Sequence, residues 1–433
     1  MNKKREICLL NDSFPPLIDG VANAVTNYAR VLTESDSFSA CVVTPENPGA
    51  DDSRFPYPVI RYPGLDLTKT IGYTAGNPFS GRLQLSLNER DICLLHTHCP
   101  VMSNILAREL RGSMKVPIVM TYHTKFDVDI ANITDLELLR DGLIHALVDS
   151  VSACDELWTV SDGAGKNIQS LGYEGDYIVM PNGVDIPRQS ISETEMMKLT
   201  SGTDIPAGVP VFLFVGRMMW YKGIRIILDA LAALKSRSLD FRMIFIGGGG
   251  DYNEILSVCS QLQLSDRCIF LGPVHDRTVL TAWYRRADLF LFPSTFDTNG
   301  LVVREAAACS LGTVMIKGSC AAEGVTDNVD GLLVEENAAS LAVCLATVMN
   351  CKDFLRSVGE KASENLYLSW DDAVKTAMDR YETVLDNWRS GRYPKHRNPA
   401  DAAFRIQGDV LELLQKADRR RRELEDLIRK DLM

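Results

Sequence analysis

Short apolar runs alternate with amphipathic stretches along this chain, and the alternation occurs twice. Runs of strand length lie at 7–10, 92–95, 118–121 and 156–160, and again at 211–215, 241–246, 289–292 and 313–316. Stretches of helical period, such as 21–32 and 224–234, lie between them. Strands that alternate with helices predict a parallel sheet with helices on both faces, so the expected fold class is α/β.

Two such domains are expected, because 433 residues are more than one hydrophobic core usually supports. A polar segment rich in Ser, Thr and Pro at 187–210 separates the two halves. We therefore predict a first domain over 1–189 and a second domain over 190–370. A helix over 371–392 is expected to cross back to the first domain, and 393–433 is expected to form a basic helical tail.

The tail differs in charge from the rest of the chain. Residues 390–433 carry 11 Lys and Arg against 8 Asp and Glu, whereas the whole chain has a net charge of -11. One helical face of the tail is apolar, with Val410, Leu414, Ala417, Leu424 and Ile428, and Arg420 and Arg421 interrupt it. We expect this helix to pack on the body of the protein or to form a homodimer. The alternative is a peripheral contact with an anionic membrane.

Composition argues against several classes of function. A net charge of -11 argues against general binding of nucleic acid. The 11 cysteines are scattered without C-x-x-C spacing, which indicates reduced thiols. The first apolar run ends at Asn11, which indicates a strand rather than a signal peptide, and no apolar run reaches membrane-spanning length. These features favour a cytoplasmic protein, with the inner face of the membrane as an alternative location.

The segment 292–305 carries the most informative spacing of charged residues. Asp297 lies just before a predicted helix that starts at Leu301, and Glu305 lies about two turns further on. The free N–H groups of a helix start form an anion site. Two carboxylates around such a site suit a ligand with hydroxyls at both ends and phosphate between them, as in a sugar nucleotide. The alternative is an N-cap Asp and a surface Glu.

Other strand–loop–helix junctions add cations and glycines. Arg217 and Lys222 follow the strand at 211–215 and could neutralise a diphosphate, although they could also be a solvated surface pair. The glycine run at 247–250 and Gly20 would let the backbone approach a ligand closely. His123 ends a strand, where it could serve the site or simply be packed. His96 and His98 share one face of a strand, but no third ligand is apparent, so no metal is expected.

Together these junctions resemble the retaining glycosyltransferases of family 4, over about residues 5 to 385. The matching segments, in order, are Asp19-Gly20-Val21, His123, Pro181 to Asp185, Val215 to Arg217 with Lys222-Gly223, Phe245 to Gly247 with Gly249, Ala287-Asp288, Phe292 to Ser294, Asp297 to Glu305 and Asp330 to Leu332. The resemblance implies the GT-B fold, in which two Rossmann-like domains face a central cleft. It also implies transfer of a hexose from a nucleotide diphosphate sugar, preferably a UDP-sugar, without a metal or another cofactor.

The resemblance also implies roles for single residues. Arg217 and Lys222 would hold the diphosphate, and Glu305 would take the ribose hydroxyls. Asp297, where the family usually has Glu, would face the transferred sugar, and its carboxylate reaches roughly 1.5 Å less. His123 would lie near the sugar and the acceptor. The remaining contacts to the nucleotide sugar would come from Gly20, Gly247, Gly249, Asn299, Gly300 and Leu301.

The acceptor is less constrained than the donor. The segment 122–129 is similar to the corresponding segment of bacterial glycosyltransferases that act on diacylglycerol. The segment 65–79, with Tyr73 and Phe79, could present apolar groups beside the cleft. A lipid-linked acceptor and a saccharide acceptor therefore both remain open. A sugar-nucleotide-binding or assembly protein without catalysis is the alternative function. Loss of Arg217, Lys222 or Glu305 would favour it, and the chain retains all three.

Overall fold

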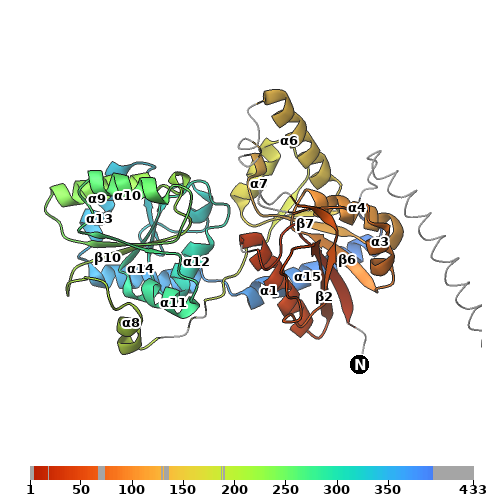
Figure 1. Ribbon diagram of the computed structural model, residues 1–433, viewed down its shortest axis with the longest axis horizontal. Coiled ribbons are helices and arrows are strands. Elements are labelled where there is room, and N and C mark those ends of the chain that lie inside the picture. Colours follow the sequence, from red (N-terminus) through yellow and green to blue (C-terminus); the bar gives the residue numbers. More distant parts are fainter. Residues whose placement is uncertain are drawn as a thin grey trace, which may run out of the picture. The chain divides into compact units, whose positions relative to one another are not determined.

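The computed structural model describes residues 4–17, 19–66, 74–127, 130, 136–186, 188 and 191–393. The chain divides into two compact units (Figure 1). The first comprises Met1–Val160, Ala164–Pro181 and the chain from Val374 on, and the second comprises Ser161–Gly163 and Asn182–Ala373. Apart from the short segment Ser161–Gly163, the chain passes into the second unit at 181/182 and returns at 373/374, compared with the predicted boundaries at 189/190 and 370/371. The predicted tail lies outside the described residues from 394 on.

The first unit contains a seven-stranded parallel sheet with the strand order β3-β2-β1-β6-β7-β8-β9. The strands are β1 (Arg5–Leu10), β2 (Phe38–Pro45), β3 (Val59–Tyr62), β6 (Ile92–Thr97), β7 (Ile118–Tyr122), β8 (Glu156–Thr159) and β9 (Tyr177–Val179). Its helices are α1 (Gly20–Glu34), α3 (Gly81–Asn88), α4 (Met102–Met114), α6 (Glu137–Ser152), α7 (Asp162–Ser170) and most of α15 (Trp370–Arg389). A small antiparallel hairpin, β4 (Gly64–Asp66) and β5 (Thr74–Gly76), accompanies the sheet.

The second unit contains a six-stranded parallel sheet with the order β12-β11-β10-β13-β14-β15. The strands are β10 (Val211–Val215), β11 (Arg242–Ile246), β12 (Cys268–Gly272), β13 (Leu289–Phe292), β14 (Thr313–Ile316) and β15 (Leu332–Val334). Its helices are α8 (Glu193–Leu199), α9 (Ile224–Ser236), α10 (Tyr252–Gln261), α11 (Arg277–Arg286), α12 (Leu301–Ala308), α13 (Ala338–Val348) and α14 (Lys352–Asn365). Figure 1 shows α9, α10 and α13 on one face of the sheet and α11 and α14 on the other.

The apolar runs form strands because both faces of each sheet are covered by helices. All four side chains of β13 are buried, and β10 is likewise buried along its length. The helices are amphipathic and place apolar stripes on the sheets, as α9 does with Ile227, Leu231 and Leu234. Each unit therefore has its own hydrophobic core, as two domains require.

α15 belongs to the first unit from Val374 on because polar and aromatic contacts fix it there. The Arg380 guanidinium donates two hydrogen bonds to the Glu156 carboxylate of β8, at 2.9 and 2.7 Å. The Tyr381 ring is wholly buried and stacks on Trp158, with 5.2 Å between ring centroids. The helix expected over 371–392 is thus present, and its described contacts beyond residue 373 are with the first unit.

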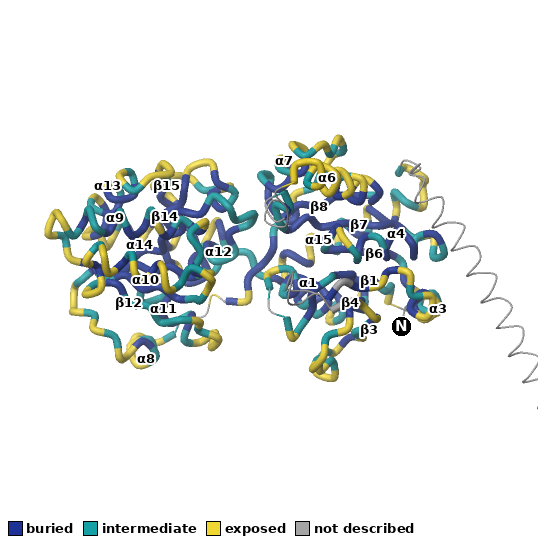
Figure 2. Tube along the Cα trace, turned by 45° about the horizontal axis from the view of Figure 1, so that its top comes forward, coloured by how far each residue is buried: buried dark blue, intermediate teal, exposed yellow. Residues whose placement is uncertain are grey.

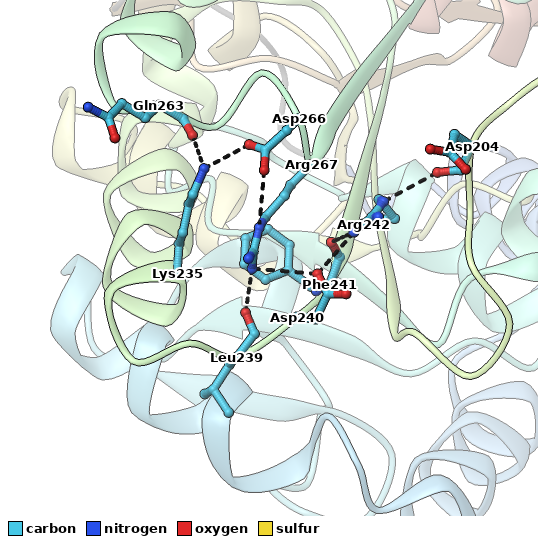
Figure 3. Close-up of polar contacts among 9 residues, drawn as sticks. All are labelled: Asp204, Lys235, Leu239, Asp240, Phe241, Arg242, Gln263, Asp266 and Arg267. Atoms are coloured by element: carbon cyan, nitrogen blue, oxygen red, sulfur yellow. Dashed lines mark hydrogen bonds and ion pairs between the residues drawn. The ribbon is translucent and has the colours of Figure 1, made fainter.

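A network of ion pairs connects the loops at the amino ends of β11 and β12 (Figure 3). Lys235, at the end of α9, donates to Asp266 at 2.8 Å, and Arg267 donates to the carbonyl oxygen of Leu239 at 2.5 Å. Arg242 donates to Asp240 at 3.0 Å. The network therefore stabilises the edge of the sheet opposite the carboxyl ends of its strands.

Both sheets have a topological switch point, where the order of strands reverses. It lies between β1 and β6 in the first unit and between β10 and β13 in the second. The loops that follow such a pair of strands diverge to opposite faces and leave a crevice in which ligands bind in open α/β sheets. Within the described residues, no single helix is long and apolar enough to span a membrane. The bent pair of helices α13 and α14 has the combined length and composition of a membrane-spanning segment.

Candidate functional site

Lys222 and Asp297 come from the two loops at the switch point of the second sheet. Lys222 ends a short 3-10 turn, Trp220–Lys222, that follows β10, and Asp297 lies in the loop after β13. The Lys222 ammonium donates to Asp297 Oδ1 at 2.5 Å, and the two side chains are only 10% and 22% exposed. The Ser294 hydroxyl donates to the other oxygen, Asp297 Oδ2, at 2.6 Å. The predicted cation and the predicted sugar-facing carboxylate therefore form one ion pair.

Two aromatic rings and Arg217 lie next to this ion pair. The Lys222 ammonium is 5.6 Å from the Tyr221 ring centroid and 5.8 Å from that of Phe296. The two rings contact each other at a centroid distance of 4.5 Å. Arg217 is exposed, and its guanidinium carbon is 5.8 Å from the Tyr221 ring. Two cations therefore lie within reach of one aromatic side chain, at the carboxyl end of β10.

The helix α12 begins at a glycine. Gly300, its N-cap residue, adopts a left-handed conformation, with φ of 57°, and has no side chain that could cap the helix. The neighbouring Asn299 has a buried side-chain amide nitrogen without a hydrogen-bond partner among the described residues. A buried donor without a partner is costly, so a ligand acceptor at this position would satisfy it. Asn299, Gly300 and Leu301 thus provide donors beside the Lys222–Asp297 pair.

Glu305 lies in the second turn of α12 and is held by two donors. Tyr284 of α11 donates its hydroxyl to Glu305 Oε2 at 2.9 Å, and Arg277 donates to Oε1 at 3.1 Å. Arg277 also contacts Asp185 at 3.3 Å. Burial raises the pKa of the Glu305 carboxyl, and the positive charge of Arg277 acts against this rise. The carboxylate is therefore fixed in orientation, and both Arg277 and Tyr284 favour its ionised form.

Gly247 and Gly249, which follow β11, lie so close to neighbouring backbone atoms that a side chain would clash there. A Cβ on Gly247, whose φ is +139°, would lie 1.9 Å from the carbonyl oxygen of Gly216, and a Cβ on Gly249 would lie 2.4 Å from that of Met218. Both glycines thus allow the loops after β10 and β11 to contact each other. Gly20 differs, because a Cβ there would meet no atom within 4 Å. The preceding Asp19 accepts hydrogen bonds from the N–H groups of Val21 and Ala22 and caps α1.

His123 belongs to a buried histidine cluster, which we define as His96, His98 and His123. His123 Nε2 lies 2.9 Å from His98 Nδ1, and the two rings stack at 5.2 Å. The nitrogens of His96 contact the Tyr381 hydroxyl at 2.5 Å and the Thr121 hydroxyl at 2.8 Å. Burial lowers the pKa of His123 to about 3 and lowers those of the other two. His123, expected near the sugar and acceptor, is therefore a neutral group only 5% exposed.

Arg277, Tyr284 and Ser294 are site residues that the sequence alone did not indicate. Arg277 follows the N-cap Asp276 at the start of α11, in the junction after β12. Such a strand–loop–helix junction is the same signal that pointed to Arg217 and Lys222. Ser294 lies inside the matched segment 292–294, but its contact with Asp297 depends on how the loop folds back. The hydrogen-bond partners of these three side chains depend on the tertiary structure, so the sequence alone could not reveal them.

The chain matches two family models, one in each half. Residues 18–188 match the model described as Glycosyltransferase Family 4, and residues 198–365 match the model described as Glycosyl transferases group 1. The chain belongs to the glycosyltransferases of family 4 and group 1. The two matched regions of this glycosyltransferase correspond to its two parallel α/β domains, in agreement with the predicted fold class and enzyme class.

Curated relatives of this glycosyltransferase include enzymes with different acceptors in their names. The alpha-monoglucosyldiacylglycerol synthase of Streptococcus pneumoniae is 23% identical over 312 residues, covering 70% of this chain and 69% of the relative. The D-inositol 3-phosphate glycosyltransferase of Xylanimonas cellulosilytica is 28% identical over 280 residues, covering 61% of this chain and 66% of the relative.

Solved structures share the fold of this glycosyltransferase. The sucrose-phosphate synthase of Thermosynechococcus elongatus has a TM-score of 0.73 and 19% identity, over 88% of this chain and all (100%) of that chain. The HepE protein of Anabaena in complex with UDP has a TM-score of 0.70 and 18% identity, over 87% of this chain and 100% of that chain. These similarities establish the two-domain GT-B fold.

Proposed function

We propose that this glycosyltransferase moves a hexose from a UDP-sugar to a lipid-linked acceptor, with retention of configuration and without a metal ion. The observation that carries the donor half of this proposal is the grouping of Lys222, Arg217, the α12 start and Glu305 in one unit. All four lie at the carboxyl ends of neighbouring parallel strands. The UDP complexes of the HepE protein, which shares the fold, support UDP as the nucleotide.

The cations would act on the leaving group. Breaking the bond between the anomeric carbon and the diphosphate places negative charge on the phosphate oxygens. Lys222, Arg217 and the N–H groups at the start of α12 would stabilise that charge in the transition state. In many enzymes a divalent cation performs this task, and two side-chain cations offer the same compensation here. We therefore propose that activity survives removal of divalent metals by a chelator.

Glu305 would bind the ribose of the donor. A carboxylate that is ionised accepts hydrogen bonds from two neighbouring hydroxyls, and its two oxygens suit the 2′ and 3′ hydroxyls of a ribose. Tyr284 and Arg277 each donate to one oxygen of Glu305, which leaves lone pairs on both oxygens for a ligand. Asn299 would satisfy its buried amide on a phosphate or sugar oxygen of the donor.

Retention of configuration requires attack from the face that the diphosphate leaves. We propose that the acceptor hydroxyl forms its bond to the anomeric carbon while the bond to the diphosphate breaks. The proton of that hydroxyl would pass to a phosphate oxygen of the leaving diphosphate. His123, which remains neutral because it is buried, would act as a hydrogen-bonding group rather than as an imidazolium.

The lipid acceptor is supported by an exposed apolar segment of the first unit. Leu136, Leu138, Leu139 and Leu143 at the beginning of α6 are exposed, and Leu138 is 87% exposed. Figure 2 shows this part of α6 in the colour of exposed residues. α6 lies between β7 and β8 in the sequence of the first unit. A lipid surface would cover these leucines, and the name of the Streptococcus pneumoniae relative supports a diacylglycerol-based acceptor.

A panel of nucleotide sugars tests the donor half. The protein is incubated with each UDP-, ADP- and GDP-sugar, with and without a chelator, and nucleotide release is measured. We expect release from a UDP-sugar that the chelator does not abolish, and the anomeric configuration of the isolated product should match that of the donor. The absence of binding and release with every donor would overturn the proposed function.

Vesicles test the acceptor half. The double variant Leu138→Ser/Leu139→Ser should bind phosphatidylcholine–diacylglycerol vesicles less than wild type in sedimentation and should transfer sugar to them more slowly. Val343→Ser is the matched control, because Val343 is 63% exposed on α13 of the second unit. Release of nucleotide to water should stay unchanged in both variants. Equal vesicle binding by wild type and the double variant would favour a saccharide acceptor.

A further inference from the structure

We propose that Ser294 and Asp297 are positioning residues that hold the Lys222 ammonium in place for the diphosphate. This inference rests on the proposed function for the identity of the ligand, but not for the arrangement of the side chains. It changes the role of Asp297, which would act on the donor through Lys222 instead of through the transferred sugar.

The contacts of Asp297 carry the inference. One carboxylate oxygen accepts from Lys222 at 2.5 Å and the other from Ser294 at 2.6 Å. Ser294 is wholly buried, so water cannot replace its hydroxyl as the donor. The carboxylate is therefore fixed by one neutral donor and one cation, both from the protein. Each oxygen retains a lone pair, so a sugar hydroxyl would have to bind the same oxygens that hold Lys222 and Ser294.

Lys222 retains hydrogen-bonding capacity in this arrangement. An ammonium group has three N–H donors, and Asp297 takes one of them, so two remain for phosphate oxygens. The four-carbon side chain of a lysine is otherwise flexible. The rings of Tyr221 and Phe296, at 5.6 and 5.8 Å from the ammonium, further restrict its position. The cation is thus in place before the donor binds, which lowers the entropic cost of using it in the reaction.

The carboxylate has two opposing effects on the diphosphate. Its charge partly offsets that of Lys222 and so weakens attraction of phosphate in the ground state. Its position orients the ammonium, which favours the transition state. Asp297→Asn keeps the shape of the side chain but removes the charge. We therefore expect this variant to bind UDP more tightly, by roughly tenfold, and to have a lower kcat with the sugar donor.

A first experiment needs no ligand. The protein is treated briefly with acetic anhydride, and acetylation of each lysine is measured by peptide mass spectrometry. Lys222 should react slowly in wild type and faster in Asp297→Asn and in Ser294→Ala. Lys235, paired with Asp266 elsewhere in the second unit, is the internal reference and should not change. Equal Lys222 reactivity in all three proteins would overturn the proposed arrangement.

A second experiment separates Lys222 from the sugar. Calorimetric affinities for UDP and for uridine are measured in wild type, Asp297→Asn, Lys222→Met and the double variant. The proposal predicts tighter binding of UDP but not of uridine in Asp297→Asn. It also predicts that Asp297→Asn lowers kcat with the sugar donor when Lys222 is present and causes no further loss of kcat once Lys222 is Met. Unchanged UDP affinity with changed affinity for the UDP-sugar would show that Asp297 contacts the sugar. If wild type binds no UDP, the proposed function fails, while the acetylation result still decides the role of Ser294 and Asp297.

Discussion

Replacement of Arg277 by Gln tests whether this arginine keeps the buried Glu305 carboxylate ionised and oriented in the nucleotide site. Arg277 donates to Glu305 at 3.1 Å; its own side chain is 54% exposed, and that of Glu305 is 13% exposed. Solvent weakens a pair with one partner half exposed, so we take its contribution as about 1 kcal/mol. If the interaction between the ionised Glu305 and the ribose is weakened by this free energy, kcat/KM for the donor falls roughly fivefold. Tyr284 still donates to the other oxygen, so activity should be reduced and not abolished.

The pH dependence of kcat/KM shows in which direction Arg277 shifts the pKa of Glu305. Burial raises the pKa of Glu305, and Arg277 opposes that rise. Removing the guanidinium favours the protonated carboxyl, so the pKa rises further and the acid limb of kcat/KM moves to higher pH. The assay is donor kcat/KM measured across the pH range in wild type and Arg277→Gln.

Arg225→Gln is the matched control for this prediction. Arg225 is 59% exposed and pairs with Asp229 within α9, so the same substitution removes a similar surface ion pair elsewhere. Its kcat/KM and acid limb should equal those of wild type. If the acid limb of Arg277→Gln stays in place or moves to lower pH, Arg277 does not control the charge of Glu305.

Two further predictions concern stability. Gly223→Ala should lower the free energy of unfolding of the second unit by about 2 kcal/mol or more, because Gly223 has φ of +75° and a Cβ would lie 2.1 Å from the Pro293 carbonyl oxygen. Gly81→Ala, where no atom lies within 4 Å, should change the urea midpoint little, and equal midpoints for the two variants would contradict the clash. The histidine cluster should make the first unit less stable as the pH falls below about 6.5, because the unfolded chain binds protons that the buried rings, with the pKa of His123 at about 3, do not. The urea midpoint should therefore drop between about pH 7.5 and pH 5, and His123→Gln should reduce the drop; a midpoint independent of pH in wild type would contradict this account.

The sequence was sufficient to predict the fold because short continuous apolar runs like those in this chain form buried strands of a parallel sheet. The run at 289–292 forms β13 over the same residues, and the helix expected to start at Leu301 spans Leu301–Ala308. A four-residue run without polar side chains must be covered on both faces, which a parallel sheet with two helical layers provides. α13 was not predicted, because its composition is apolar on nearly all sides and so lacks a helical period.

The pairing of charges could not be predicted in the same way. Lys222 and Asp297 were placed at different parts of the donor, and they form an ion pair across a sequence separation of 75 residues. Glu305 was expected to be available to ribose, and its dependence on Arg277, 28 residues earlier, was not foreseen. Which carboxylate meets which cation depends on side-chain positions after the loops of β10, β12 and β13 come together. No local period in the sequence encodes that choice.

Binding of UDP and of uridine to two variants tests the central claim most directly. The claim is that Lys222 serves the diphosphate and Glu305 serves the ribose, in one site of the second unit. Calorimetry should therefore show that Lys222→Met lowers the affinity for UDP and leaves the affinity for uridine unchanged. Glu305→Gln should lower the affinity for both ligands. Equal affinities of wild type and both variants for UDP would contradict the claim.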